Sequence, residues 1–194
     1  MRGVARLRGA ARALAGTSSE SGALALPPDL PAGFGPLCAG FGPLCKRARP
    51  FTMTSPERMY ALYESVRYIV SAGIAGDIVE CGVWRGGSAM IAALTLVEMD
   101  ASRRMWLYHT FEGMPPPGDY DVYSSGEHAR EILQASDPLR RDHYQARAGL
   151  DEVRTNIAAT GHADVQYVVG RVEDTIPHDS SARDCIAATR YGLV

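Results

Sequence analysis

The sequence lacks three features that would each point to a particular class of protein. It has no apolar run near the roughly 20 residues of a membrane-spanning helix, so we expect no membrane insertion. It has no basic excess, because 20 Lys and Arg residues stand against 22 Asp and Glu residues, and this argues against a nucleic-acid partner. Its four cysteines have no CxxC spacing, which argues against a disulfide framework or a zinc site.

The composition is that of one globular domain in a chain of 194 residues, with 46% hydrophobic and 22% charged residues. The charge is unevenly distributed, since residues 1–50 carry a net charge of +5 and the remaining residues −7. Residues 1–50 are also rich in Ala, Gly, Pro and Arg, and they contain a seven-residue tandem repeat. We expect a disordered basic extension there, with an organelle-targeting peptide as the alternative.

From about residue 51 the pattern changes to alternating helices and strands. Residues 54–57 are typical of a helix start, and apolar residues then recur at spacings of three and four. Short apolar runs predict buried strands at residues 77–83, 105–109 and 165–170. Helical patterns lie between them, at residues 89–99, 127–135 and 149–159. Strands that alternate with helices predict an α/β fold with a parallel sheet.

A glycine-rich motif follows the first predicted strand, at the sheet edge where ligands of such folds bind. Residues 80–88 read Glu-Cys-Gly-Val-Trp-Arg-Gly-Gly-Ser and lead into a helix. The acidic side chain suits an ammonium group and the helix N-terminus suits a carboxylate, so the motif fits an amino acid, such as the methionine half of S-adenosylmethionine. The alternative is a tight connection without a ligand. Because the spacing is not GxGxxG, a dinucleotide such as NAD is a remote alternative.

Two further motifs follow the second and third predicted strands. The second strand ends in His109, at the position where an acidic side chain usually binds ribose hydroxyls. The alternative is a surface histidine at a strand end. The third strand leads into a turn with Glu173 and Asp174, which would place a carboxylate near an adenine edge. The alternative is a solvated charged turn in which Thr175 or Asp174 caps a helix.

Four segments occur in an order and spacing that resemble the macrocin O-methyltransferase (TylF/MycF-like) family: residues 51–58, 80–88, 111–115 and 172–177. The resemblance implies a class I, S-adenosylmethionine- and Mg²⁺-dependent O-methyltransferase that acts on sugar hydroxyls of natural products. It also implies a lid in the proline-rich stretch after Met114. The cofactor-binding residues expected from it and from the motifs are Thr52, Met53, Glu80, Gly82, Gly86, Gly87, Ser88, His109, Phe111, Glu112, Gly113, Glu173 and Asp174.

The sequence departs from the family pattern in two ways. His109 stands where the family has Asp, so we expect weaker ribose recognition. The family segments Asp-Thr-Asp-Trp-Tyr and Asp-Asp-Tyr, whose aspartates bind magnesium and supply the general base, have no counterpart here. We therefore expect no catalytic and no metal-binding residues in this chain. The expected fold is the N-terminal half of a Rossmann-like methyltransferase sheet, with about three parallel strands and flanking helices.

The expected organisation is a disordered extension (residues 1–50), a partial methyltransferase domain (51–178) and an unmatched tail (179–194). The tail can be back-translated with codons that, when read one base later, encode Asp-Thr-Asp-Trp-Tyr. A frameshift in the coding sequence is therefore one hypothesis for the origin of the tail. Two functions stay open: an O-methyltransferase impaired by loss of the metal-binding segment, or an inactive remnant that at most binds S-adenosylmethionine. We expect a small glycosylated acceptor as the partner and a cytoplasmic location. The sequence is also compatible with a homo-oligomer.

Overall fold

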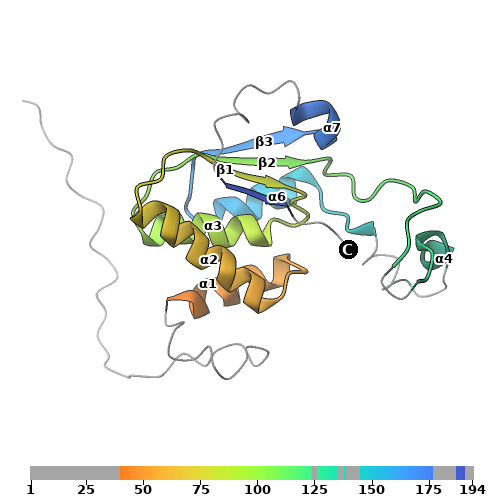
Figure 1. Ribbon diagram of the computed structural model, residues 1–194, viewed down its shortest axis with the longest axis horizontal. Coiled ribbons are helices and arrows are strands. Elements are labelled where there is room, and N and C mark those ends of the chain that lie inside the picture. The colour runs from red at the N-terminus through yellow and green to blue at the C-terminus, as the bar shows by residue number, and fades with distance from the viewer. Residues whose placement is uncertain (1–39, 124–125, 135–137, 139–144, 177–186, 191–194) are drawn as a thin grey trace, which may run out of the picture.

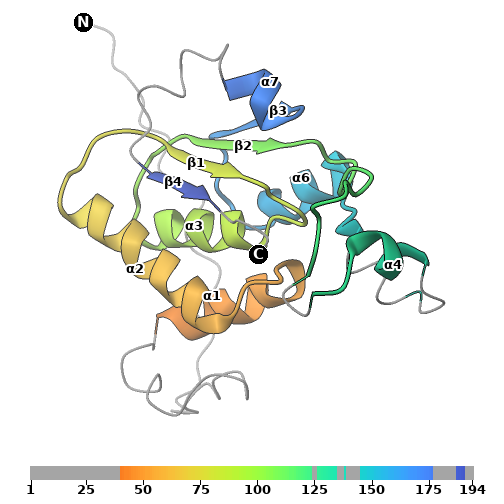
Figure 2. The same cartoon turned by 45° about the vertical axis from the view of Figure 1, so that its right-hand side comes forward.

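The computed structural model describes residues 40–123, 126–134, 138, 145–176 and 187–190, and within them a parallel sheet carries helices mainly on one face (Figures 1 and 2). The strands are β1 (Ile78–Cys81), β2 (Met105–His109), β3 (Val165–Val169) and β4 (Ala187–Arg190). Their order is β3-β2-β1-β4, and every neighbouring pair is parallel. The predicted α/β class is confirmed.

The helices follow the predicted alternation with the strands. They are α1 (Phe41–Ala48), the 3-10 helix η2 (Arg49–Phe51), α2 (Pro56–Ser71), α3 (Gly87–Glu98), α4 (Ala129–Gln134), α6 (Leu150–Ala158) and α7 (Val172–Thr175). The predicted helix start at residues 54–57 is confirmed, because α2 begins at Pro56 with Glu57 in its first turn. No helix in the described part of the chain is long and apolar enough to cross a membrane.

Helix α3 forms the centre of the hydrophobic core. Ten of its twelve residues are buried, because α3 lies beneath the sheet and also contacts α1, α2 and α6 (Figures 1 and 2). A helix that is apolar on all sides is typical of such a position. Ile78, Met105 and Leu107 of the sheet belong to the same buried cluster. The first residues of α3 are thereby held firmly at the carboxyl edge of β1.

Helix α1 lies inside the segment that the sequence predicted to be disordered. Phe41, Cys45 and Ala48 are fully buried, and the Phe41 ring packs on Tyr60 and Tyr63 at centroid distances of 5.3 and 5.5 Å. The prediction of disorder is therefore wrong for residues 41–50, while residues 1–39 lie outside the described residues. The three buried side chains share one helical face, but glycine and proline in the repeat concealed that spacing.

Strand β4 adds a fourth strand to the three that were expected. It pairs in parallel with β1, from Ile78 opposite Ala187 to Cys81 opposite Arg190. It lies within the segment assigned to an unmatched tail. The residues of β4 have no distinctive apolar run, so the strand is recognised only by its pairing in the sheet. The three predicted strands are confirmed with boundaries that differ by no more than two residues.

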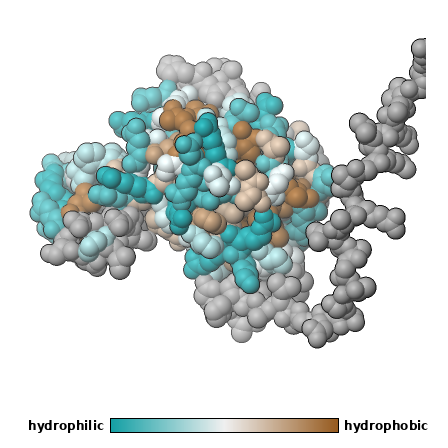
Figure 3. Space-filling view, turned by 180° about the vertical axis from the view of Figure 1, so that it is seen from behind, coloured by the Kyte–Doolittle hydropathy of each residue, from teal (hydrophilic) through white to brown (hydrophobic). Residues whose placement is uncertain are grey.

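Exposed hydrophobic side chains are spread over several elements of the described chain. The most exposed examples are Tyr68 in α2, Val169 in β3, and Tyr120 and Val122 in the segment after β2. On the face that Figure 3 shows, hydrophobic patches are small and lie among hydrophilic residues. This distribution is typical of an ordinary protein surface. A homo-oligomer therefore stays a prediction.

Candidate cofactor site

A cavity of about 270 Å³ lies at the carboxyl edge of β1 and β2. Three main segments line it: the turn after η2, the loop from β1 into α3, and the residues that follow β2. The lining residues are Phe51, Thr52, Met53, Thr54, Arg58, Glu80, Gly82, Val83, Trp84, Ser88, His109, Gly113, Met114 and Ala146. In parallel α/β sheets, ligands bind at this edge.

Seven of the thirteen predicted cofactor residues line this cavity, namely Thr52, Met53, Glu80, Gly82, Ser88, His109 and Gly113. The other six do not. Gly86 and Gly87 shape the start of α3, and the ring of Phe111 packs on His109. Glu112 is exposed beside the cavity, and Glu173 and Asp174 are exposed in α7. The adenine contact expected of Glu173 or Asp174 stays a prediction.

The cavity also contains residues that the sequence did not single out as contacts. Phe51, Thr54 and Arg58 belong to the first family-like segment, so that motif was an available signal. Ala146 lies before α6 and follows no recognisable motif, so only the tertiary structure reveals it. The proline-rich stretch after Met114 was expected to form part of a lid, but Met114 itself lines the cavity and residues 115–118 do not. The lid therefore stays a prediction.

Glu80 is the buried carboxyl group of this cavity, with a residue exposure of only 4%. It lies in β1, and its carboxylate accepts a hydrogen bond from the backbone N–H of Ala89 in the first turn of α3. Burial raises the pKa of the Glu80 carboxyl from 4.5 to about 8, outweighing the hydrogen bond, which lowers it. An incoming cation would favour the charged form, so this group suits the ammonium group of a ligand.

His109 contributes the second polar group at the carboxyl edge. Its ring packs edge-on against Phe111, with centroids 5.2 Å apart and an interplanar angle of 84°. Its Nε2 atom is buried and has no hydrogen-bond partner among the described residues. Burial lowers the pKa of the imidazole, which favours its neutral form. Because a buried nitrogen without a partner costs free energy, this residue suits a ligand hydroxyl such as that of a ribose.

Backbone strain is concentrated around the cavity. The described chain has four non-glycine residues with positive φ. Two of them, Trp84 at 48° and Ala146 at 43°, line the cavity, and a third, Phe111 at 58°, packs on His109. Such conformations cost of order 1–3 kcal/mol each and cluster at binding sites. The strain thus supports the assignment of this cavity as a functional site.

Two chain segments cross closely at Gly113, beside His109. Gly113 has a φ of +92°, and a Cβ atom there would lie 2.6 Å from the carbonyl oxygen of Gln145. The backbone N–H of Met114 donates a hydrogen bond to the same carbonyl at 2.9 Å. Glycine at this position therefore allows residues 145–147 to approach, which brings Ala146 into the cavity wall.

A substitution at Gly87 tests how closely the turn after η2 lies on α3. An added Cβ atom would lie 2.6 Å from the carbonyl carbon and oxygen of Phe51 and from the Cβ atom of Thr52. Because backbone atoms cannot swing aside, we expect Gly87→Ala to lower the free energy of unfolding by about 1–3 kcal/mol in urea unfolding experiments. Gly118→Ala is the control, since its Cβ would meet nothing closer than 3.6 Å. If both variants have the same free energy of unfolding, this close approach is contradicted.

The described residues contain no group of three or more His, Cys, Asp or Glu side chains that could hold a metal ion. Within the described ranges the structure thus offers no ligand set for the Mg²⁺ that the family resemblance implies, and both the metal and the loss of its ligands stay predictions. Of the tail to which the frameshift hypothesis applies, residues 179–186 and 191–194 lie outside the described part of the chain.

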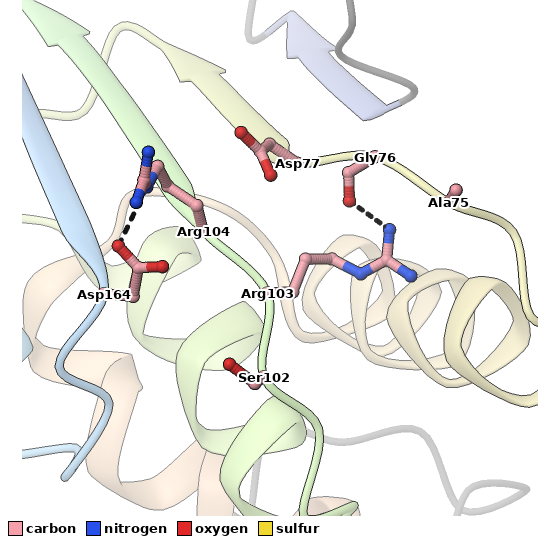
Figure 4. A pocket seen from close by; sticks show the side chains of 7 residues that line it. All are labelled: Ala75, Gly76, Asp77, Ser102, Arg103, Arg104 and Asp164. Atoms are coloured by element: carbon pink, nitrogen blue, oxygen red, sulfur yellow. Dashed lines mark hydrogen bonds and ion pairs between the residues drawn. The ribbon is translucent and has the colours of Figure 1, made fainter.

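A second cavity, of about 340 Å³, lies at the opposite, amino edge of the sheet (Figure 4). Its charged side chains already have partners within the protein. The Nε atom of Arg104 lies 2.9 Å from Asp164 Oδ1, and Arg103 donates to backbone carbonyl groups. Asp77 accepts a hydrogen bond from the Trp106 indole at 2.8 Å. We therefore assign no ligand to this cavity.

The macrocin-O-methyltransferase (TylF) family model matches residues 46–190. The match includes most of residues 179–194, so the prediction that this tail has no family counterpart is wrong up to residue 190. The matched region also begins inside the segment that was predicted to be a disordered extension.

Three curated relatives are O-methyltransferases. The chain is 33% identical over 137 residues to 8-demethyl-8-(2,3-dimethoxy-alpha-L-rhamnosyl)-tetracenomycin-C 4'-O-methyltransferase of Streptomyces olivaceus, covering 68% of this chain and 48% of the relative. It is 29% identical to demethyldecarbamoylnovobiocin O-methyltransferase of Streptomyces niveus (67% and 47%). It is also 29% identical to mycinamicin III 3''-O-methyltransferase of Micromonospora griseorubida (65% and 48%).

The solved structure of the O-methyltransferase NovP superposes with a TM-score of 0.52 at 28% identity, covering 67% of this chain and 51% of that one. The chain spans about half the length of the relatives it matches. The family model covers most of the chain, and the relatives and the fold agree with it. The chain therefore belongs to the macrocin O-methyltransferase (TylF) family.

Proposed function

We propose that this chain forms the S-adenosylmethionine-binding part of an O-methyltransferase that acts on a sugar hydroxyl of a natural product in the cytoplasm. One observation carries the proposal: the buried carboxyl group of Glu80 and the neutral imidazole of His109 line the same cavity at the carboxyl edge of the sheet. The names of the three relatives support a small natural product as the acceptor.

The polar groups of the cavity match the two ends of the cofactor. We assign Glu80 to the ammonium group of its methionine half. Ser88 lines the cavity in the first turn of α3, where a hydroxyl group and a helix N-terminus together favour the carboxylate. His109 is assigned to one ribose hydroxyl, because each nitrogen of a neutral imidazole makes one hydrogen bond. When bound, S-adenosylmethionine supplies an electrophilic methyl group.

Methyl transfer also needs a base for the acceptor hydroxyl, and the resemblance implies that Mg²⁺ assists this step. The described residues contain no group of side chains that could hold the metal, and the proposal assigns neither the base nor the metal ligands to any of them. The alternative is a chain that binds S-adenosylmethionine without turnover. A remote alternative is an NAD-binding fragment.

Isothermal titration with S-adenosylhomocysteine tests the proposal directly. We expect saturable binding of one equivalent of S-adenosylhomocysteine and no binding of NAD. Incubation with S-adenosylmethionine, Mg²⁺ and a glycosylated acceptor then separates the two functions, because methyl transfer supports the enzyme and binding alone supports the inactive chain. Binding of NAD in place of S-adenosylhomocysteine, or binding of neither, would refute the proposed cofactor.

A further inference from the structure

We propose that Arg85 is a positioning residue that holds one wall of the cofactor cavity in place without touching the cofactor. The wall consists of residues 51–54, which we call the 51–54 wall, and all four residues line the cavity while Arg85 does not. The proposal rests on the proposed function of that cavity. Arg85 belongs to the glycine-rich motif, but it neither lines the cavity nor belongs to the buried core. The proposal gives this arginine a role.

The side chain of Arg85 bridges α6 and the start of the 51–54 wall. Its Nε atom donates to Glu152 Oε1 at 2.6 Å, and its Nη1 atom donates to the carbonyl oxygen of Pro50 at 3.0 Å. The guanidinium group lies over the rings of Phe51 and Trp84, at 5.1 and 5.8 Å from their centroids. One planar group therefore holds an ion pair, a backbone hydrogen bond and two aromatic contacts.

The backbone of Arg85 is anchored as well as its side chain. The Asn156 side chain on α6 is largely buried, and its Nδ2 atom donates to the Arg85 carbonyl oxygen at 2.9 Å. Both ends of Arg85 are thus tied to α6, which packs against α3 in the core. The bridge therefore fixes the position of the 51–54 wall relative to the core. The 51–54 wall also has contacts that do not involve Arg85, since Phe51 and Thr52 lie close against Gly87 of α3 and the Thr54 backbone N–H donates to Thr52 Oγ1 at 3.0 Å.

Lysine cannot reproduce this bridge although it keeps the charge. An ammonium group is a point charge without a planar face, so it can pair with Glu152 or reach the Pro50 carbonyl but cannot also stack on the rings. Arg85→Lys should therefore release the 51–54 wall while leaving the net charge unchanged. The cavity would keep all of its lining residues, and only the position of one wall would become less well defined.

Arg104 provides a matched control at the other edge of the sheet. Its Nε atom pairs with Asp164 at 2.9 Å, and its guanidinium lies 5.8 Å from the centroid of a tryptophan ring, that of Trp106. Its side chain is 46% exposed, comparable with 36% for Arg85. Arg104 lines the amino-edge cavity of Figure 4 and is absent from the lining of the cofactor cavity. Arg104→Lys therefore perturbs an ion pair and an aromatic contact, two of the three kinds of contact that Arg85 makes, away from the cofactor.

The experiment compares the two lysine variants in the full chain. We expect similar, small decreases in Tm for both, because partly exposed ion pairs contribute little to stability. Only Arg85→Lys should raise the Kd for S-adenosylhomocysteine, by about tenfold, which corresponds to about 1.4 kcal/mol. Only this variant should also accelerate hydrogen exchange at the amides of residues 51–54. Glu152→Gln, which can still accept the arginine hydrogen bond, should give a smaller effect in the same direction.

Two results would overturn the proposal. If Arg85→Lys lowers Tm and leaves both the Kd and the exchange of residues 51–54 unchanged, Arg85 only stabilises the fold. If both lysine variants change the Kd equally, the effect is not specific to the 51–54 wall. If the unsubstituted chain does not bind S-adenosylhomocysteine, the proposed function fails instead, and the hydrogen exchange of residues 51–54 alone decides whether Arg85 holds the wall.

Discussion

Glu80→Gln is expected to stabilise the free protein at pH 8 and, at the same pH, to weaken the binding of S-adenosylhomocysteine by about 10- to 100-fold. The two effects have opposite signs because they depend on different states of the carboxyl group. In the free protein, a buried charge costs free energy, and glutamine avoids this cost. In the complex, the charge pairs with the ligand ammonium group, and glutamine cannot supply it.

The pH dependence of stability follows from the same pKa. The Glu80 carboxyl has its usual pKa of 4.5 when the chain is unfolded and a pKa of about 8 when it is folded. Between these values the folded state binds more protons than the unfolded state, so the Glu80 contribution to the free energy of unfolding is present below about pH 4.5 and is lost as pH rises through about 8. This part of the pH dependence should disappear in Glu80→Gln.

Urea unfolding of both proteins from pH 5 to 9 measures the difference, and titration calorimetry at each pH measures the affinity. The affinity of the unsubstituted chain should rise toward pH 8, because less free energy is then needed to remove the Glu80 proton. Glu64→Gln is the control, since Glu64 is an exposed residue of α2 that pairs with Arg67 at 3.2 Å. If stability differences between Glu80→Gln and the unsubstituted chain do not vary with pH, Glu80 is not a buried, protonated carboxyl.

Phe41→Ala is expected to lower the free energy of unfolding by about 3–5 kcal/mol, the usual cost of emptying a buried phenylalanine site. Phe41 has no exposed surface and packs on two tyrosine rings of α2. A loss of this size is a large part of the 5–15 kcal/mol by which domains are typically stable. Denaturant unfolding followed by circular dichroism measures it.

Tyr68→Ala is the matched control for Phe41→Ala. Tyr68 lies on the same helix as the tyrosines that contact Phe41, but it is 67% exposed, so its removal should change stability by less than about 0.5 kcal/mol. If Phe41→Ala unfolds at the same urea concentration as this control, α1 does not dock on α2 and α3. In that case the folded region would begin near residue 51, as the sequence suggested.

The alternation of strands and helices was predictable because it depends on local spacing. Apolar residues recur with the period of a helix in α2, and short apolar runs mark β1, β2 and β3. Elements without such a pattern were missed. The buried face of α1 is interrupted by glycine and proline, and β4 is a strand because β1 offers it an edge to pair with.

The amino-acid sequence by itself determined the family, the α/β class and the polar residues at the ends of the first two strands. Glu80 and His109 were predictable because carboxyl ends of parallel strands always meet at one edge. The tertiary structure alone decided which other segments reach that edge. Three features each join segments that are distant in sequence. They are the place of Ala146 in the cavity lining, the close contact at Gly87 and the bridge made by Arg85. Such contacts depend on packing in space, and no local spacing encodes them.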